Sequence, residues 1–141
     1  MTELAYLILA VIALLVAFSP AWTTALGALF LGVCVPARVA LAWAAPYLPP
    51  EVYLVPAAGF AYSSVAGGGR GFFGGEAWWA SLRPLHSLNY FGAYLLSSAG
   101  AKEEARVVLL LDVLLGLAWR RQTHAKSGAA CQGAAASCAA N

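Results

Sequence analysis

Polar side chains inside two long apolar stretches are the groups in this sequence best suited to chemistry. One stretch holds Asp112 in its middle, and the other holds four polar residues: Arg83, His86, Asn89 and Tyr90. Ionisable groups in such stretches are costly, so they normally face protein or a cavity and find partners there. Asn89 and Tyr90 follow His86 after three and four residues, which puts all three on one helical face. A carboxylate facing them could accept hydrogen bonds, relay a proton or hold a small solute.

The two stretches are expected to form a helical hairpin that turns near Gly100. With a rise of about 1.5 Å per residue, residues of the two helices whose numbers sum to about 202 lie at the same depth. Asp112 is then level with Tyr90. It can accept a hydrogen bond from Tyr90 or Asn89, or pair with His86 one turn away. The leading interpretation is a structural clasp that holds the hairpin together, and the alternative is a proton relay, an ion site or a ligand site.

Gly116 shares a helical face with Asp112, because the two residues are four positions apart. In the same register Gly116 lies level with His86. A glycine there lets a neighbouring backbone come close, as small residues do between membrane helices. If the clasp is structural, an asparagine at position 112 should be tolerated, since its amide can bond to the same face.

The composition indicates that these polar residues belong to a membrane protein. Of the 141 residues, 62% are hydrophobic and 10% are charged, and the mean hydropathy is +0.75. Soluble domains have about 45–50% apolar and about 25% charged residues. The net charge of +2 comes from basic residues scattered along the chain, so we expect no nucleic-acid partner.

The apolar runs predict an all-α fold, a polytopic membrane helix bundle with four or five transmembrane helices in residues 1–126. Arg38, near the end of the second run, is explained by its side chain reaching toward the lipid–water interface. The expected spans are residues 4–22, 23–45, 82–99 and 104–120, with 53–66 as a weaker candidate because it is short. Interface anchors are expected at four tryptophans: Trp22, Trp78, Trp79 and Trp119.

Basic residues directly after the last run predict that the C-terminus faces the cytosol. These residues are Arg120, Arg121, His124 and Lys126. Five spans would put the N-terminus on the opposite side, whereas four spans with a re-entrant segment at 53–66 would put both ends together. Residues 127–141 are rich in Ala, Gly and Ser, and we expect this tail to be disordered.

The recognisable motifs of enzymes and metal sites are absent from the sequence. Residues 69–74 match G-x-G-x-x-G, but neither a preceding strand nor the later acidic residue of a dinucleotide site accompanies them. The three cysteines, Cys34, Cys131 and Cys138, and the two histidines have no spacing typical of a metal site. We therefore expect no catalytic residue, no metal and no cofactor.

A pattern in the second half of the chain resembles an uncharacterised family of small multi-spanning membrane proteins. That family occurs in large DNA viruses of protists and in some algae. The resemblance implies a shared helical core and carries no assigned activity. It rests on Trp78-Trp79, then Leu82-Arg83-Pro84-Leu85-His86 and Tyr90, and later Leu-Leu-Leu-Asp112-Val-Leu-Leu-Gly116.

Three interpretations of function follow from these observations. The first is a non-enzymatic structural or assembly component of a membrane, whose partners are the lipid bilayer and other membrane proteins or a second copy. The second is a small carrier of protons or solute that uses Asp112 and His86. The third is a small membrane enzyme that resembles the DoxX-like or MAPEG families in size, although residues 83–89 depart from the MAPEG motif spacing. Few polar residues in the first two spans favour the first interpretation.

Overall fold

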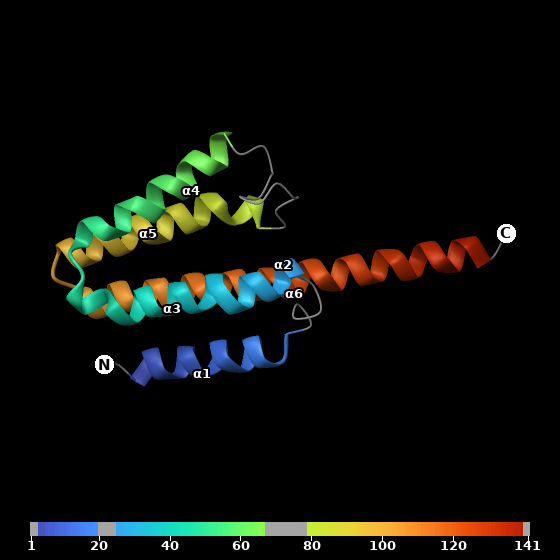
Figure 1. The fold of residues 1–141 in the computed structure, drawn as a ribbon, viewed down its shortest axis with the longest axis horizontal. Coiled ribbons are helices and arrows are strands. Elements are labelled where there is room, and N and C mark those ends of the chain that lie inside the picture. Colours follow the sequence, from blue (N-terminus) through green and yellow to red (C-terminus); the bar gives the residue numbers. More distant parts are fainter. Residues whose placement is uncertain (1–2, 20–24, 67–78, 140–141) are drawn as a thin grey trace.

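The computed structural model describes residues 3–19, 25–66 and 79–139. Every regular element in these ranges is helical, so the predicted all-α class is confirmed. Figure 1 shows the longer helices running alternately in opposite directions along one axis. The elements in chain order are α1 (Glu3–Ala17), α2 (Ala25–Leu29), η2 (Phe30–Cys34), α3 (Val35–Ala44), η3 (Ala45–Tyr47), η4 (Pro50–Tyr53), α4 (Leu54–Ala66), η5 (Ala80–Leu82), α5 (Arg83–Ser98) and α6 (Lys102–Ala139).

A proline explains the irregular turn in the second long helix. α2, η2, α3 and η3 follow one another without a break, and η2 is a π-helical turn in which the Val35 N–H bonds to the Phe30 carbonyl. Pro36 has no N–H, and in a regular α-helix its ring would collide with the carbonyl four residues earlier. The widened turn just before Pro36 relieves this contact. The helix therefore continues past the proline and carries Arg38.

The expected hairpin is present, with a turn at Gly100 between α5 and α6. Gly100 has φ of 84°, a left-handed conformation that glycine adopts without strain. The Gly100 N–H bonds to the Ser97 carbonyl (3.1 Å), and the Ala101 N–H bonds to the Leu96 carbonyl (2.9 Å). This pair of bonds is the Schellman pattern that ends a helix. α6 then returns along α5 and packs against it.

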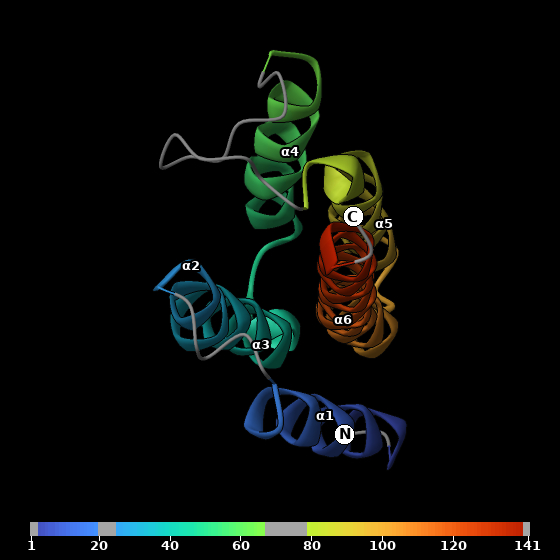
Figure 2. The same cartoon turned by 90° about the vertical axis from the view of Figure 1, so that its right-hand side faces the viewer.

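α4 packs against α5 and runs antiparallel to it. The Arg83 Nη1 atom donates to the Ser63 carbonyl (2.8 Å), and the Ser87 hydroxyl donates to the Ala57 carbonyl (2.8 Å). The end of α4 thus lies beside the start of α5. The Arg83 cation sits at a carbonyl of the last turn of α4, where a positive charge is favourable. Figure 2 shows α5 between α4 and α6.

Two basic residues at the start of α6 hold the end of α3 and η3. Lys102 Nζ donates to the Pro46 carbonyl (3.0 Å), and Arg106 Nη2 donates to the Trp43 carbonyl (3.4 Å). Arg106 also pairs with Glu103 (3.0 Å) and lies over the Trp43 ring, 5.5 Å from its centroid. Because the last carbonyls of a helix have no partner within the helix, these contacts satisfy them and fix α6 against α3.

The main core lies where α1, α3 and α5 pack against α6. On α6 the buried apolar side chains include Leu109, Leu110, Val113 and Leu117. α1 contributes Ala5, Ile8 and Ile12, which recur at helical spacing on one face. α6 is therefore the central helix of the bundle.

One segment of the described residues, Gly27–Tyr47, is long and apolar enough to cross a bilayer. It has 21 residues, and the apolar helix α1 is shorter, with 15. A single segment of this kind is weak support for association with a membrane, since the core helix of a soluble protein passes the same test. The four or five predicted spans remain a prediction.

The structure differs from the sequence prediction after residue 126. We expected the tail to be disordered, but α6 continues as a helix through Ser127 to Ala139. Alanine has the highest helix propensity and this stretch contains no proline, which favours a helix here in spite of Gly128 and Gly133. In Figure 1 this last part of α6 extends beyond the other helices.

The tail is therefore expected to be dispensable for the stability of the bundle. A chain that ends at Lys126 should enter the membrane fraction and keep the melting temperature of the full chain in mild detergent. A chain that ends at Gly116 is the control, because it lacks the buried Leu117 and should melt at a lower temperature. A marked loss of stability in the chain ending at Lys126 would mean that residues 127–141 pack on the bundle.

Candidate functional site

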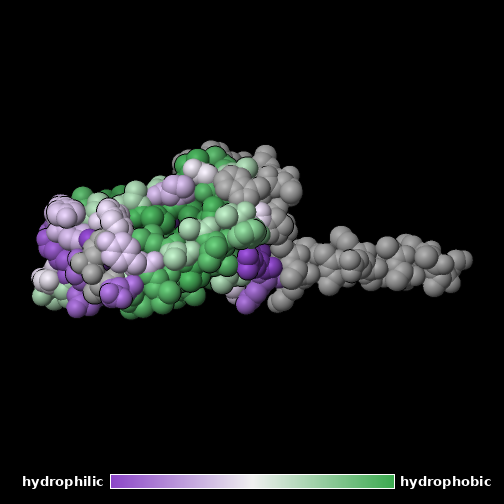
Figure 3. All heavy atoms as spheres, turned by 90° about the horizontal axis from the view of Figure 1, so that it is seen from below, coloured by the Kyte–Doolittle hydropathy of each residue, from purple (hydrophilic) through white to green (hydrophobic). Residues whose placement is uncertain are grey.

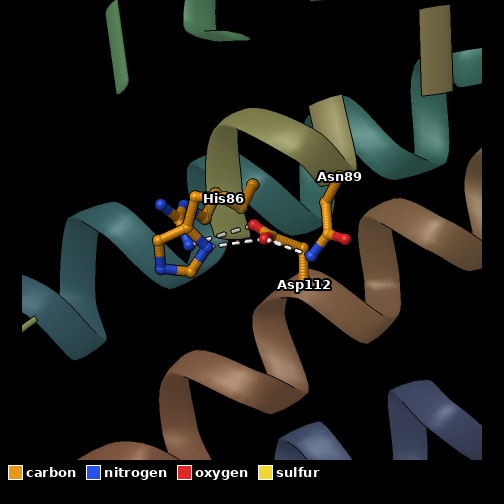
Figure 4. A network of polar contacts seen from close by, with 4 residues as sticks. His86, Asn89 and Asp112 are labelled. Carbon is orange, nitrogen blue, oxygen red and sulfur yellow. Dashed lines mark hydrogen bonds and ion pairs between the residues drawn. The ribbon is translucent and has the colours of Figure 1, made fainter. Parts of the chain in front are cut away.

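The carboxylate of Asp112 is the centre of a buried polar cluster. Asp112 is fully buried in the first third of α6, the part that packs in the bundle. The His86 Nδ1 atom lies 2.5 Å from Asp112 Oδ1, and Asn89 Nδ2 donates to the same oxygen at 3.0 Å. The Arg38 Nη1 atom lies 3.2 Å from Oδ2. Figure 4 shows the Asp112 carboxylate between the side chains of His86 and Asn89. We call these four residues the Asp112 cluster.

The cluster joins three helices, because Arg38 comes from α3, His86 and Asn89 come from α5, and Asp112 comes from α6. An ionised carboxylate only accepts hydrogen bonds, so the His86 Nδ1 atom donates to Oδ1. Oδ2 has no hydrogen bond of good geometry within the described part of the chain. Oδ2 contacts Arg38 at ion-pair distance. The energy of an ion pair depends on charge more than on direction.

An aromatic ring from α4 covers the cluster. The Arg38 guanidinium lies over the Phe60 ring, 5.1 Å from its centroid. The His86 ring is 5.2 Å from the same ring, and Tyr90 stacks on it at 5.8 Å. A guanidinium over an aromatic face is attracted by the ring quadrupole. Phe60 therefore brings a fourth helix into contact with the cluster without adding a polar group.

The structure brings together three of the residues that we expected to meet: His86, Asn89 and Asp112. Tyr90 is buried on the same face of α5, but it packs on Phe60 and has no hydrogen bond to Asp112. Arg83 is buried as well, and its hydrogen bond goes to the Ser63 carbonyl at the far end of α4. Arg83 and Tyr90 therefore both contact α4.

Arg38 is the member of the Asp112 cluster that we did not assign to it from the sequence. We explained it by an interfacial side chain, and this was wrong, because Arg38 turns inward to Asp112. The physical reason is that a buried carboxylate offers the guanidinium a counter-charge inside the bundle. The sequence offered one signal, an arginine in one apolar run and an aspartate in another. That signal is not sufficient, because two such residues can meet only if their helices are neighbours.

Gly116 faces the cluster, level with His86 as the hairpin register predicts. A Cβ atom at this position would lie 3.8 Å from Phe30 Cζ, 3.9 Å from Arg38 Nη1 and 4.0 Å from His86 Cε1. We expected a neighbouring backbone here, but the nearest atoms are side chains. The missing side chain of Gly116 thus leaves room for the inward-turned Arg38.

The predicted interface tryptophans lie away from the cluster or outside the described residues. Trp79 immediately precedes η5, and Trp119 lies on α6 after the core positions, and both are half-buried. Trp22 and Trp78 are outside the described residues. Their expected place at a lipid–water boundary remains a prediction.

The chemistry of the cluster is that of charge pairing and proton donation. Within residues 3–19, 25–66 and 79–139, no three His, Cys, Asp or Glu side chains gather as a group that could hold a metal ion. The hydroxyl nearest in sequence to His86 is that of Ser87, and it donates to the Ala57 carbonyl on α4.

Comparison of the chain with protein-family models, with curated proteins and with solved structures gives no match.

Proposed function

We propose that this chain is an integral membrane protein with five spans, and that it acts as a non-enzymatic structural or assembly component. The Asp112 cluster would be the polar clasp that fixes its helices inside the bilayer. The observation that carries the proposal is that one buried carboxylate binds groups from α3 and α5 at both of its oxygens. Each contact joins two helices, and removing the carboxylate would leave polar groups buried without partners.

The length of α6 and the directions of the helices support five spans. On α6, Lys102 and Arg120 are 18 residues apart, which corresponds to about 27 Å of helix against about 30 Å for the hydrocarbon core. α4 ends beside the start of α5, as the Arg83–Ser63 hydrogen bond requires, so α4 crosses along α5 and does not turn back. This arrangement favours five spans over four with a re-entrant segment.

The surface of the bundle supports immersion in lipid. Figure 3 shows a hydrophobic band between two more hydrophilic ends. Soluble monomers rarely expose large continuous apolar patches, and lipid is the solvent that such a band fits. The exposed large apolar residues of α1 and α5 include Leu4, Leu7, Leu14, Leu88, Phe91 and Leu95.

The charges at the two ends support a cytosolic C-terminus. Glu3, Glu51 and Glu104 are exposed at the end that holds the start of α1 and the α5–α6 turn. Arg120 and Arg121 lie at the other end. At the first end the basic residues Lys102 and Arg106 bond to carbonyls of the chain. Basic residues near spans are enriched on the cytosolic side, which is the end of Arg120.

We predict that Glu51 and Glu104 lie on the same side of the membrane, opposite the C-terminus. The single variants Glu51→Cys and Glu104→Cys, made after replacing the native cysteines with Ser, should both react with an impermeant maleimide from outside intact cells. Cys131, kept as the only cysteine, should react only after permeabilisation. Five spans require this pattern, because an even number of crossings separates positions 51 and 104.

Two other patterns would contradict parts of the proposal. If positions 51 and 104 are labelled from opposite sides, residues 53–66 are re-entrant and the chain has four spans. If both react only after permeabilisation while Cys131 reacts from outside, the orientation is reversed. The labelling yield of a variant with no cysteine gives the background.

A proton-flux measurement separates the structural proposal from the carrier alternative. Liposomes that contain the protein and a pH-sensitive dye are given a membrane potential, and the rate of internal pH change is compared with that of empty liposomes. We expect equal rates, because Asp112 and His86 are both buried in the bundle. A faster rate that disappears in Asp112→Asn would replace the structural proposal with the carrier.

Proteins that co-purify in mild detergent would identify the assembly partner.

A further inference from the structure

Three exposed aromatic side chains lie at the end of the bundle that holds the start of α1 and the α5–α6 turn. Tyr6 is 56% exposed, Trp43 is 42% exposed and Tyr47 is 85% exposed. They come from the start of α1, the end of α3 and the end of η3. We did not predict any of them as an interface anchor from the sequence. We call these three residues the aromatic group.

Contacts on two sides hold the Trp43 ring in place. The Arg106 guanidinium lies over the ring, 5.5 Å from its centroid, and the Tyr6 ring meets it edge-on at 6.2 Å. Arg106 is itself buried and pairs with Glu103. The indole N–H of Trp43 can only donate, and it has no acceptor within the described part of the chain. The exposed part of the indole therefore offers an apolar edge and one donor in a fixed position.

The depth of the aromatic group matches the edge of a hydrocarbon core. Arg38 pairs with Asp112, which lies near the middle of the proposed α6 span. Trp43 and Tyr47 follow Arg38 by five and nine residues, which places their backbones about 8 Å and about 14 Å from that level. Half of a hydrocarbon core is about 15 Å thick. Tyr47 is therefore at the boundary, and the Trp43 side chain lies in the outermost hydrocarbon.

The exposed residues around the aromatic group change from charged to apolar across it. Glu51 is exposed beyond Tyr47, toward the outer end, whereas Val33 is 56% exposed on the other side of Trp43. Tryptophan and tyrosine combine an apolar ring with one polar group, and both are enriched where hydrocarbon meets lipid headgroups. Ester carbonyls of phospholipids lie at this depth and can accept hydrogen bonds from an indole or a phenol. The partner that fits all three side chains is the headgroup boundary of a lipid leaflet.

We infer that the aromatic group binds the headgroup boundary of the non-cytosolic leaflet. The indole N–H donates to a lipid ester carbonyl, the two phenols donate to headgroup oxygens, and the rings replace hydrocarbon between them. These contacts fix the depth of the bundle at the end opposite to Arg120. The inference rests on the proposed membrane placement and specifies the lipid groups that it meets at that end.

Quenching of Trp43 fluorescence by labelled lipids tests this depth. The other four tryptophans are replaced by Phe, and the protein is placed in phosphatidylcholine vesicles whose lipids carry a spin label near the start or near the end of the acyl chain. The label near the start should quench Trp43 about two-fold more strongly than the label near the end. Equal or stronger quenching by the label near the end would overturn the inference, and so would no quenching by either. If the single-tryptophan chain does not fold, the difference between wild type and Trp43→Phe gives the same measurement.

A tryptophan at another depth separates this inference from the membrane placement. Leu111 is 44% exposed and lies beside Asp112, near the middle of the proposed core. With all five native tryptophans replaced by Phe, Leu111→Trp should be quenched more strongly by the label near the end of the chain. If it behaves so while Trp43 fails its own test, the membrane placement stands and the inference is wrong. No quenching of Leu111→Trp by either label would contradict the placement and the inference together.

Discussion

Replacing Arg38 alone by Met should cost about 3 kcal/mol of stability, and replacing Asp112 by Leu in the same chain should restore most of it. The two side chains form an ion pair of 3.2 Å, with Asp112 fully buried. The single change leaves the carboxylate without a counter-charge. Breaking a buried pair costs about 3–5 kcal/mol, whereas replacing both partners with apolar groups is often neutral or stabilising. Arg38 is partly exposed, so we expect the lower end of that range.

Unfolding of the wild type, both single variants and the double variant in one detergent measures this effect. We expect a coupling energy of about 2 kcal/mol between positions 38 and 112. Asp112→Asn should be intermediate, because the amide keeps bonds to His86 and Asn89 but gives Arg38 no counter-charge. From the sequence we expected Asp112→Asn to be tolerated, but that expectation did not take the ion pair between Asp112 and Arg38 into account. If the costs of the two single changes simply add in the double variant, the pair does not hold the bundle.

Replacing Gly116 by Leu should cost about 2 kcal/mol, while Gly116→Ala should be neutral or slightly stabilising. A Cβ atom at Gly116 would lie 3.8 Å or more from Phe30, Arg38 and His86, which is ordinary contact. Alanine therefore fits and is the better helix former. The further carbons of leucine have no room and must displace the guanidinium or the imidazole from Asp112.

The same unfolding measurement compares the two Gly116 variants with wild type. Leu115→Ala is a useful control on the adjacent residue, because Leu115 is 41% exposed and its change should cost little. A Gly116→Leu variant as stable as wild type would show that the cluster can rearrange without loss. A destabilised Gly116→Ala variant would mean that the packing at this face is tighter than the structure has it.

The hairpin of α5 and α6 could be predicted because local chemistry determines it. Gly100 supplies the left-handed residue that ends α5, and the rise of a helix then fixes which residues are level. His86 and Asn89 meet Asp112 for this reason. Tyr90 has the right depth as well, but its side chain lies against Phe60. The depth of a residue follows from counting residues along the helix, whereas the direction of its side chain depends on the side chains of the neighbouring helix.

The neighbours of this hairpin could not be predicted in the same way. The second helix is apolar on almost every side, so hydrophobic periodicity does not select the face that meets α6. Arg38 was therefore assigned to the interface, although it pairs with Asp112. Arg83, which shares a helix with His86, was assigned to the cluster, although it bonds to Ser63. Each error concerns a contact between helices distant in sequence.

The positions of the two hairpin helices and the shared depth of His86, Asn89 and Asp112 followed from the sequence, because they depend on the turn at Gly100 and on the fixed rise of a helix. The rotation of α3 about its axis and the position of α4 beside α5 came only from the tertiary structure. These depend on which of many similar apolar faces pack best, and on where a buried charge finds its partner. The same packing placed Phe60 over the cluster and left one side of Arg38 exposed.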